Sequence, residues 1–368
     1  MFENIPRETL TPKERGALYN AGKEVDHIPY SLLGTEAAAI LYGMDIRKTY
    51  IDTETVIELE KKMVQDFGIG CMLVGPRLKG IAEALGAEMR YPANNMYLVN
   101  ESLITEYHVL DKLEIINPYK DGKLPIMLSM LDALKKKFGN YDNIKSSICG
   151  PMSCAISLRD AGLFLRDLRK DPDDVHRLLR FSLECIKAWM KVVYDEFGCV
   201  CGIADPASSM DLIGKNQFDE FSKPYLKELV EWTREYTGRS PSIHICGRSK
   251  KVWTDLQEIG FSGFSVDNCE DLLELKRCLG DTMAISGNVP PVDVLKNGNP
   301  KMVIENVKEC LVKASDNPNG FLLSAGCQIP LGTPKENLLA FVYAARIYGT
   351  RRALPASEPM HLQIAKSL

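Results

Sequence analysis

A histidine and a cysteine lie two positions apart in the stretch "SPSIHICG" at 240–247, and another cysteine lies at position 327. Residues i and i+2 of a β-strand project from the same face, so His244 and Cys246 would point the same way in a strand. One imidazole and two thiolates suit Zn²⁺, and three protein ligands with one open position are typical of catalytic zinc sites. Free cysteine is also among the most buried residue types. The spacing alone therefore leaves a metal site and core packing both open.

Short β-prone stretches recur along the chain, and amphipathic stretches of helical period separate them. We expect strands at 26–33, 68–75, 143–150, 198–205, 240–247, 260–267, 282–289 and 320–327. Strands that alternate with helices predict a parallel sheet, and eight such units favour a closed (β/α)8 TIM barrel. The sequence contains neither GxGxxG nor GxxxxGK[ST], which argues against a doubly wound nucleotide-binding fold.

The whole chain, 1–368, is expected to form this single α/β barrel domain. Residues 1–25 would be a helical extension, because Thr11, Pro12 and Glu14 form a capping box with proline in the first turn. Residues 88–125 interrupt the alternation of strands and helices. We expect them to form an insertion with a hairpin and a lid.

In a (β/α)8 barrel the active site lies at the C-terminal ends of the strands. His244 and Cys246 end the fifth expected strand, and Cys327 ends the eighth. Asp205 and Asp267 end the strands on either side of the fifth. One of these two aspartates is expected to accept a hydrogen bond from the His244 ring.

Asp205 has two further interpretations, as a fourth zinc ligand or as a helix N-cap, and the N-cap interpretation also applies to Asp267. Ser208, Asn288 and Gln328 follow other strand ends. Together with the two aspartates, they are the residues expected to bind a small substrate.

The composition is that of a soluble globular protein, with 45% hydrophobic and 26% charged residues and a net charge of −4. A slightly acidic chain argues against a nucleic-acid or anionic-membrane surface. No apolar stretch of spanning length and no leader is evident. Eleven cysteines, an odd number, are too sparse for a disulfide scaffold in a chain of this size. These features predict a cytoplasmic protein.

The sequence resembles the uroporphyrinogen decarboxylase superfamily through most of its length. The segments that carry the resemblance are "VDHIPYS", "IAEALGAEM", "ICGPMSCA", "FDEFSKPYLKELVEW", "FSVDN", "ISGNVPP" and "AGCQIPLGTPKENLLAFVYAARIYG". The family folds as a single (β/α)8 barrel, which agrees with the expected strands.

Three departures separate this chain from the true decarboxylases of that superfamily. The arginine-rich N-terminal motif is replaced by "IPYSLLGTEAAAILYG", which contains no arginine. The essential aspartate before the "EALG" helix is replaced by Gly75-Pro76-Arg77. The C-terminal histidine of a Gly-His-Gly motif is replaced by Cys327.

A second branch, the zinc-dependent methyltransferases that work with corrinoids, has His-x-Cys-Gly on one strand and a later Gly-Cys. His244, Cys246 and Cys327 match that zinc-binding pattern. The resemblance implies methyl transfer between a cobalamin held by a separate corrinoid protein and a small molecule. That molecule would be a thiol acceptor or a methylated or methoxylated donor, as in O-demethylation. A decarboxylase-like lyase and a non-catalytic ligand-binding barrel are the alternatives.

Overall fold

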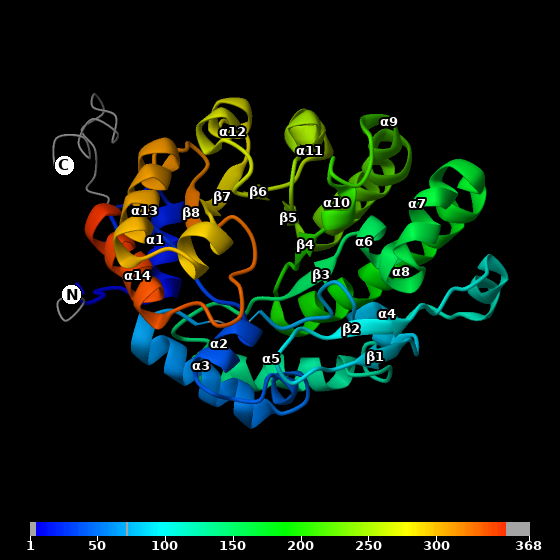
Figure 1. The fold of residues 1–368 in the computed structure, drawn as a ribbon, viewed down its shortest axis with the longest axis horizontal. Helices are drawn as coiled ribbons and strands as arrows, with labels where there is room; N and C mark the ends of the chain where they lie inside the picture. The colour runs from blue at the N-terminus through cyan, green and yellow to red at the C-terminus, as the bar shows by residue number, and fades with distance from the viewer. Residues whose placement is uncertain (1–4, 71–72, 351–368) are drawn as a thin grey trace.

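The computed structural model describes residues 5–70 and 73–350. Its strands are β1 (Glu88–Arg90), β2 (Leu98–Glu101), β3 (Ser147–Cys149), β4 (Gly202–Ala204), β5 (Ser242–Ile245), β6 (Gly263–Val266), β7 (Ala284–Val289) and β8 (Phe321–Ala325). Its α-helices are α1 (Pro12–Asn20), α2 (Thr35–Leu41), α3 (Thr53–Phe67), α4 (Gly80–Ala84), α5 (Leu124–Phe138), α6 (Pro151–Leu158), α7 (Ala161–Lys170), α8 (Pro172–Phe197), α9 (Lys215–Gln217), α10 (Lys223–Thr237), α11 (Trp253–Ile259), α12 (Leu272–Leu279), α13 (Pro300–Ala314) and α14 (Lys335–Tyr348). Figure 1 shows their arrangement.

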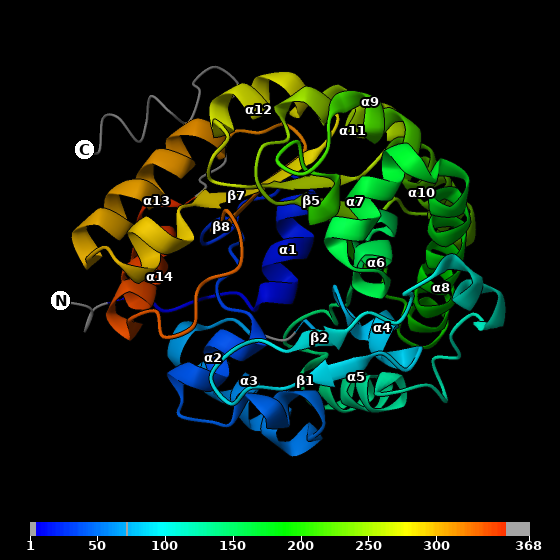
Figure 2. The same ribbon diagram turned by 45° about the vertical axis from the view of Figure 1, so that its right-hand side comes forward.

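Six of the strands form one parallel sheet in the order β3-β4-β5-β6-β7-β8. Each lies within one of the last six stretches expected to be strands, so those six predictions are confirmed. Helices follow the strands and surround them as a ring (Figure 2). The α/β barrel predicted from the alternation of elements is therefore correct.

The described residues of the first two expected strands do not form strands. In the described part of 26–33, a single parallel bridge joins Tyr30 to Leu323 of β8. Pro29 has no N–H to donate, which limits the ladder there. In 68–75, residues 71–72 lie outside the described part, and the parallel bridge to β3 falls beyond the expected strand, between Arg77 and Ile148.

Helix α1 lies across the N-terminal end of the barrel, in the middle of the ring of helices in Figure 2. The Tyr19 hydroxyl accepts a hydrogen bond of 2.9 Å from the backbone N–H of Phe321, the first residue of β8. The predicted capping box is confirmed, because the Thr11 side chain accepts from the Glu14 N–H and the Glu14 side chain accepts from the Thr11 N–H. The opposite end of the barrel carries the C-terminal ends of the strands.

The core lies between the sheet and the ring of helices. Helix α8 is typical: its apolar stripe of Leu179, Leu183, Ile186, Trp189 and Val193 is fully buried. The helix ends at Gly198, which has a φ of 66°. This periodic burial is what the sequence predicts for a helix that packs on a parallel sheet.

Residues 88–101 contain the antiparallel pair β1–β2, whose register joins Met89 to Val99. The residues between these two strands face a pocket that is described below. The expectation that this segment acts as a lid stays a prediction. None of the described helices is both long and apolar enough to cross a membrane.

Candidate metal centre

His244, Cys246 and Cys327 come together at the C-terminal ends of β5 and β8. His244 Nε2 lies 2.9 Å from Cys246 Sγ, and Cys246 Sγ lies 3.2 Å from Cys327 Sγ. All three candidate ligand atoms lie within 4.8 Å of one another, and all three residues are partly buried. Bonds of about 2.0–2.3 Å to a tetrahedral zinc would place ligand atoms about 3.5–4 Å apart, which needs only small adjustments here.

The backbone of the neighbouring strand orients the His244 ring. His244 Nδ1 lies 3.0 Å from the carbonyl oxygen of Ser265, its parallel partner on β6, and 3.0 Å from the Ser265 hydroxyl. A carbonyl oxygen only accepts hydrogen bonds, so Nδ1 carries the proton. In the neutral ring Nε2 then has a free lone pair directed at the thiols, as a metal ligand requires.

The expectation that Asp205 or Asp267 holds this ring is therefore wrong, because Ser265 occupies that position. Ser265 is the residue that reasoning from the sequence missed. A signal for it was available. It lies two positions before Asp267, and in the predicted parallel sheet it faces the same side as the histidine of the adjacent strand.

The two thiols share one hydrogen bond, which separates their affinities for protons. A hydrogen bond from Cys246 lowers the pKa of Cys327, and His244 lowers it further. The same hydrogen bond raises the pKa of Cys246, and burial raises it further. The pair therefore loses one proton readily and retains the second, which a bound cation would displace.

Two glycines allow the chain beside the candidate ligands to pack closely against neighbouring segments. Gly247 follows Cys246 with a φ of 72°, and a Cβ there would lie 2.2 Å from Asp211 Oδ2. A Cβ at Gly326, which precedes Cys327, would lie 2.4 Å from the backbone nitrogen of Asn268. Steric crowding therefore explains why a glycine follows Cys246 and another precedes Cys327.

Asp267 holds the loop after β5 and does not contact the imidazole. Its Oδ2 accepts a hydrogen bond of 2.9 Å from the Gly247 N–H, and its Oδ1 accepts one of 3.0 Å from the Cys269 N–H. The carboxylate thereby fixes the chain where it turns away from Cys246. Asp267 therefore positions Cys246, a candidate ligand, by holding the backbone of the next residue, Gly247.

Asp205 is fully buried. It stands at the N-cap position of the short helix at 206–208, as one interpretation of the sequence expected, but its side chain makes no capping hydrogen bond there. Its Oδ1 accepts from the Ser153 N–H at 2.7 Å in the first turn of α6, and its Oδ2 accepts from the Ser208 hydroxyl at 3.0 Å. Burial raises the pKa of Asp205 to about 6. Among the described residues, the group close enough to share a metal ion does not include Asp205.

The other expected substrate residues have different surroundings. Ser208 is fully buried, and its hydroxyl lies 2.6 Å from that of Ser222. The Asn288 amide donates to the carbonyl oxygens of Asp267 and Glu270 at 3.2 and 2.9 Å, so it supports the same loop. Gln328 is exposed beside Cys327. Of these three residues, Gln328 is the one whose position leaves it open to a ligand.

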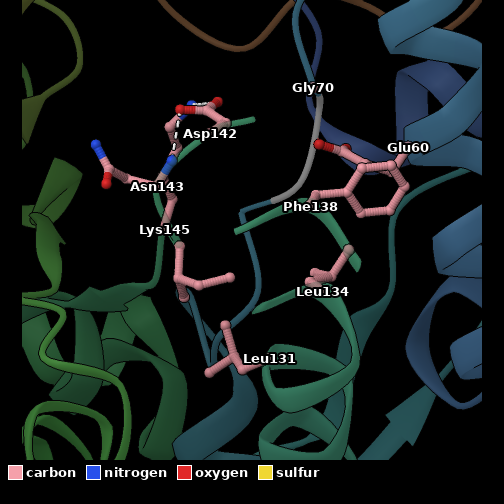
Figure 3. A pocket seen from close by; sticks show the side chains of 9 residues that line it. Glu60, Gly70, Leu131, Leu134, Phe138, Asp142, Asn143 and Lys145 are labelled. Atoms are coloured by element: carbon pink, nitrogen blue, oxygen red, sulfur yellow. Dashed lines mark hydrogen bonds and ion pairs between the residues drawn. The ribbon is translucent and has the colours of Figure 1, made fainter. Parts of the chain in front are cut away.

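Two pockets flank the barrel, at opposite ends. One lies between α3, α5 and the approach to β3, and Figure 3 shows Glu60, Phe138, Asn143 and Lys145 around it. Lys145 precedes β3, so this pocket lies toward the N-terminal ends of the strands, away from the thiols. The other pocket includes Glu36, Arg77 and several tyrosines, and it lies toward the same end as the cluster.

The chain belongs to the uroporphyrinogen decarboxylase family, whose model matches residues 11–348. This finding confirms the resemblance drawn from the sequence. Within the family, a methylcobamide:CoM methyltransferase of Methanosarcina acetivorans is 30% identical over 92% of this chain and 98% of its own length. A methylated-thiol–coenzyme M methyltransferase of Methanosarcina mazei is 25% identical over 92% of this chain and 89% of its own.

A uroporphyrinogen decarboxylase of Synechocystis is 22% identical over 64% of this chain and 67% of its own length. Among solved structures, a methyltransferase from Methanosarcina mazei aligns with a TM-score of 0.77 at 24% identity, and the alignment covers 91% of this chain and 98% of that one. The structural likeness supports the barrel fold.

Proposed function

We propose that this protein is a zinc-dependent methyltransferase that moves a methyl group from a corrinoid, held by a separate protein, to a small thiol. The observation that carries the proposal is the convergence of His244, Cys246 and Cys327 at the end of the barrel where active sites of this fold lie. The names of the two similar methyltransferases support the thiol as acceptor. A methylated or methoxylated donor is the less favoured partner.

The donor set fits zinc in kind and in number. Two soft thiolates and one imidazole would hold the ion, and the three-residue group leaves a position for a substrate. When bound, the ion would act as a Lewis acid that favours the thiolate form of a substrate thiol near neutral pH. The Ser265 carbonyl keeps the His244 lone pair directed at the site. The loop held by Asp267 keeps Cys246 in place.

The transfer itself is a displacement at carbon. The acceptor thiol first loses its proton to solvent. Its sulfur then forms a bond to the methyl carbon while the cobalt–carbon bond breaks, and both electrons of that bond stay on cobalt, which passes from Co(III) to Co(I). The corrinoid protein must present its methyl group at the C-terminal end of the barrel, so we expect it to dock on that face transiently.

The charges around Glu36 and Arg77 do not favour the decarboxylase alternative. Decarboxylation of a polyanionic porphyrinogen would require an arginine-rich surface near residues 28–43. This chain has Glu36 there, with its carboxylate fully buried against Arg77. The Glu36–Arg77 pair carries no net charge, so it does not supply the positive excess that would attract a polyanion.

Two measurements test the proposal. Metal analysis of the purified protein should find about one zinc per chain. The protein should also convert methylcob(III)alamin to cob(I)alamin, followed by absorbance, when a suitable thiol is supplied. A protein that contains no zinc when purified with and without added metal, and that fails with every thiol, would contradict the proposal.

A further inference from the structure

The pocket beside the cluster combines a buried ion pair with aromatic walls. Its lining comes from α2, the segment around Arg77, helix α5 and the turn between β1 and β2: Thr35, Glu36, Thr49, Tyr50, Leu73, Val74, Gly75, Arg77, Glu83, Tyr91, Tyr97, Lys123, Met127 and Met130. The empty space is about 490 Å³, part of it open to solvent.

The ion pair joins Glu36 to Arg77. The Glu36 side chain is 0% exposed, and its Oε1 accepts hydrogen bonds from Arg77 Nη1 and, at 3.3 Å, from the Tyr50 hydroxyl. Its Oε2 is buried and accepts no hydrogen bond from any described residue. A buried carboxylate oxygen without a partner is costly, so a ligand that offers a positive N–H donor would be stabilised there.

Arg77 offers the complementary half of the pair. Its side chain is 23% exposed, and the guanidinium has five N–H donors in a fixed fork. Its backbone has a φ of 51°, which is uncommon for a residue other than glycine. The backbone is held there by hydrogen bonds to β3 of 3.2 Å with Ser147 and 2.8 Å with Cys149. Arginine forks of this kind bind carboxylates.

The remaining charges in the lining compensate each other. Lys123 Nζ lies 2.7 Å from Glu83 and 3.6 Å from the centre of the Tyr91 ring, which in turn stacks on Tyr97. The four charged lining residues therefore carry two positive and two negative charges. A pocket of this balance favours a ligand with both signs of charge over a simple anion.

The free oxygen of Glu36 and the side chain of Gln328 lie on either side of the same glycine, Gly34. A methyl group placed on Gly34 would lie 3.9 Å from Glu36 Oε2 and 3.9 Å from Gln328 Nε2. Gln328 directly follows Cys327, so the Glu36 carboxylate and the chain segment that carries a candidate ligand share one neighbour. A small molecule could thus place one end at Glu36 and direct its other end to the thiols.

We propose that the substrate is a zwitterionic thiol, with an ammonium group at Glu36 Oε2, a carboxylate at Arg77 and its sulfur at the cluster. For the position of the sulfur, the inference rests on the proposed function. The recognition of the two charges by Glu36 and Arg77 does not require a metal. Amino-acid thiols such as homocysteine have this chemistry. A sulfonate thiol such as 2-mercaptoethanesulfonate satisfies Arg77 alone.

Isothermal titration of the purified protein tests the proposal with four thiols: L-homocysteine, 3-mercaptopropionate, 2-mercaptoethylamine and 2-mercaptoethanesulfonate. Homocysteine should bind at least about tenfold tighter than the three thiols that carry a single charge. Glu36→Gln should remove that preference. Glu58→Gln, a charge removal on the exposed face of α3, should leave it intact. Equal or tighter binding of 2-mercaptoethanesulfonate by the unmodified protein would overturn the proposal.

A sulfur-free zwitterion separates this proposal from the metal centre. L-Norleucine should bind both the unmodified protein and the double variant Cys246→Ser, Cys327→Ser, and it should compete with homocysteine. That result would stand even if the protein held no zinc and transferred no methyl group. Absence of norleucine binding to the unmodified protein would overturn the zwitterion site without the need for any Glu36 variant to fold.

Discussion

His244 Nδ1 lies 3.0 Å from the carbonyl oxygen of Ser265, the residue directly across from it on β6. In many metal sites a side-chain carboxylate performs this role, whereas here a backbone atom does. A substitution at position 265 keeps the backbone carbonyl, so variants of Ser265 should retain the hydrogen bond to the His244 ring.

Ser265→Ala removes the hydroxyl but keeps the carbonyl. We expect the affinity for zinc to weaken by less than about tenfold, below the usual 10–100-fold loss of an outer partner. Competition with a chromogenic chelator measures the change. Ser324→Ala, on β8, removes a comparable hydroxyl that pairs with Ser286 at 3.0 Å and provides the control. A loss of a hundredfold in Ser265→Ala would show that the hydroxyl holds the ring.

Cys246→Ser and Cys327→Ser each remove a soft ligand. We expect zinc content to fall from about one per chain to near zero, with a loss of methyl transfer of at least about a hundredfold. Cys278→Ser, at an exposed position on α12, should change neither quantity. Mass spectrometry of the metal and the cobalamin absorbance assay provide the readouts. Full zinc content in both site variants would place the metal elsewhere.

Asp205→Asn should alter the pH dependence of stability. Burial raises the pKa of Asp205 to about 6, so the folded protein holds this proton more tightly than the unfolded chain does. The stabilising contribution of this group is therefore complete below about pH 4 and is lost as the pH rises to about 6. The free energy of unfolding of the unmodified protein, minus that of Asp205→Asn, should fall by up to about 3 kcal/mol between pH 4 and 7. Urea unfolding at several pH values measures the difference, and a flat difference would contradict the assignment.

Gly326→Ala tests the close approach next to Cys327. The new Cβ would lie 2.4 Å from the backbone nitrogen of Asn268, so the end of β8 must move. We expect destabilisation of about 1–3 kcal/mol and weaker zinc binding. Gly16→Ala in α1 is the matched control, because a Cβ there meets nothing within 4 Å, and it should be neutral or stabilising. Calorimetry and metal titration on both variants would show whether the effect is local to Gly326.

Much of the fold could be predicted, because stretches with the period of a strand alternate with stretches that have the period of a helix. Few folds are compatible with that alternation. The stretches that became β3–β8 have apolar residues on both faces and end in polar residues, which is typical of parallel strands. The stretch that includes Pro29 looked similar in composition. It pairs at a single position, because hydrogen bonding within a ladder depends on backbone geometry that composition does not report.

The grouping of His244, Cys246 and Cys327 could also be predicted, because all three lie at expected strand ends and the family resemblance matches them to a zinc-binding pattern. The surroundings of Asp205 could not, because a carboxylate at a strand end has several nearby N–H groups to choose from. It accepts from Ser153 of α6, more than fifty positions earlier in the chain. The pairing of Glu36 with Arg77 could not be predicted either, since it joins the first turn of α2 to the segment before α4, and no periodic pattern connects the two.

The uneven pairing of the barrel has a consequence for its motions. Between β3 and β8 the strands share continuous ladders, whereas Tyr30 and Arg77 each contact the sheet through a single bridge. Backbone amides of β4 to β7 should therefore exchange with deuterium only through large-scale unfolding, while those of Tyr30, Ser31, Val74, Gly75 and Arg77 should exchange through local openings of lower free energy. The half of the barrel that carries His244 and Cys246 would stay rigid, and the half that carries Glu36 and Arg77 would be the side able to admit a substrate.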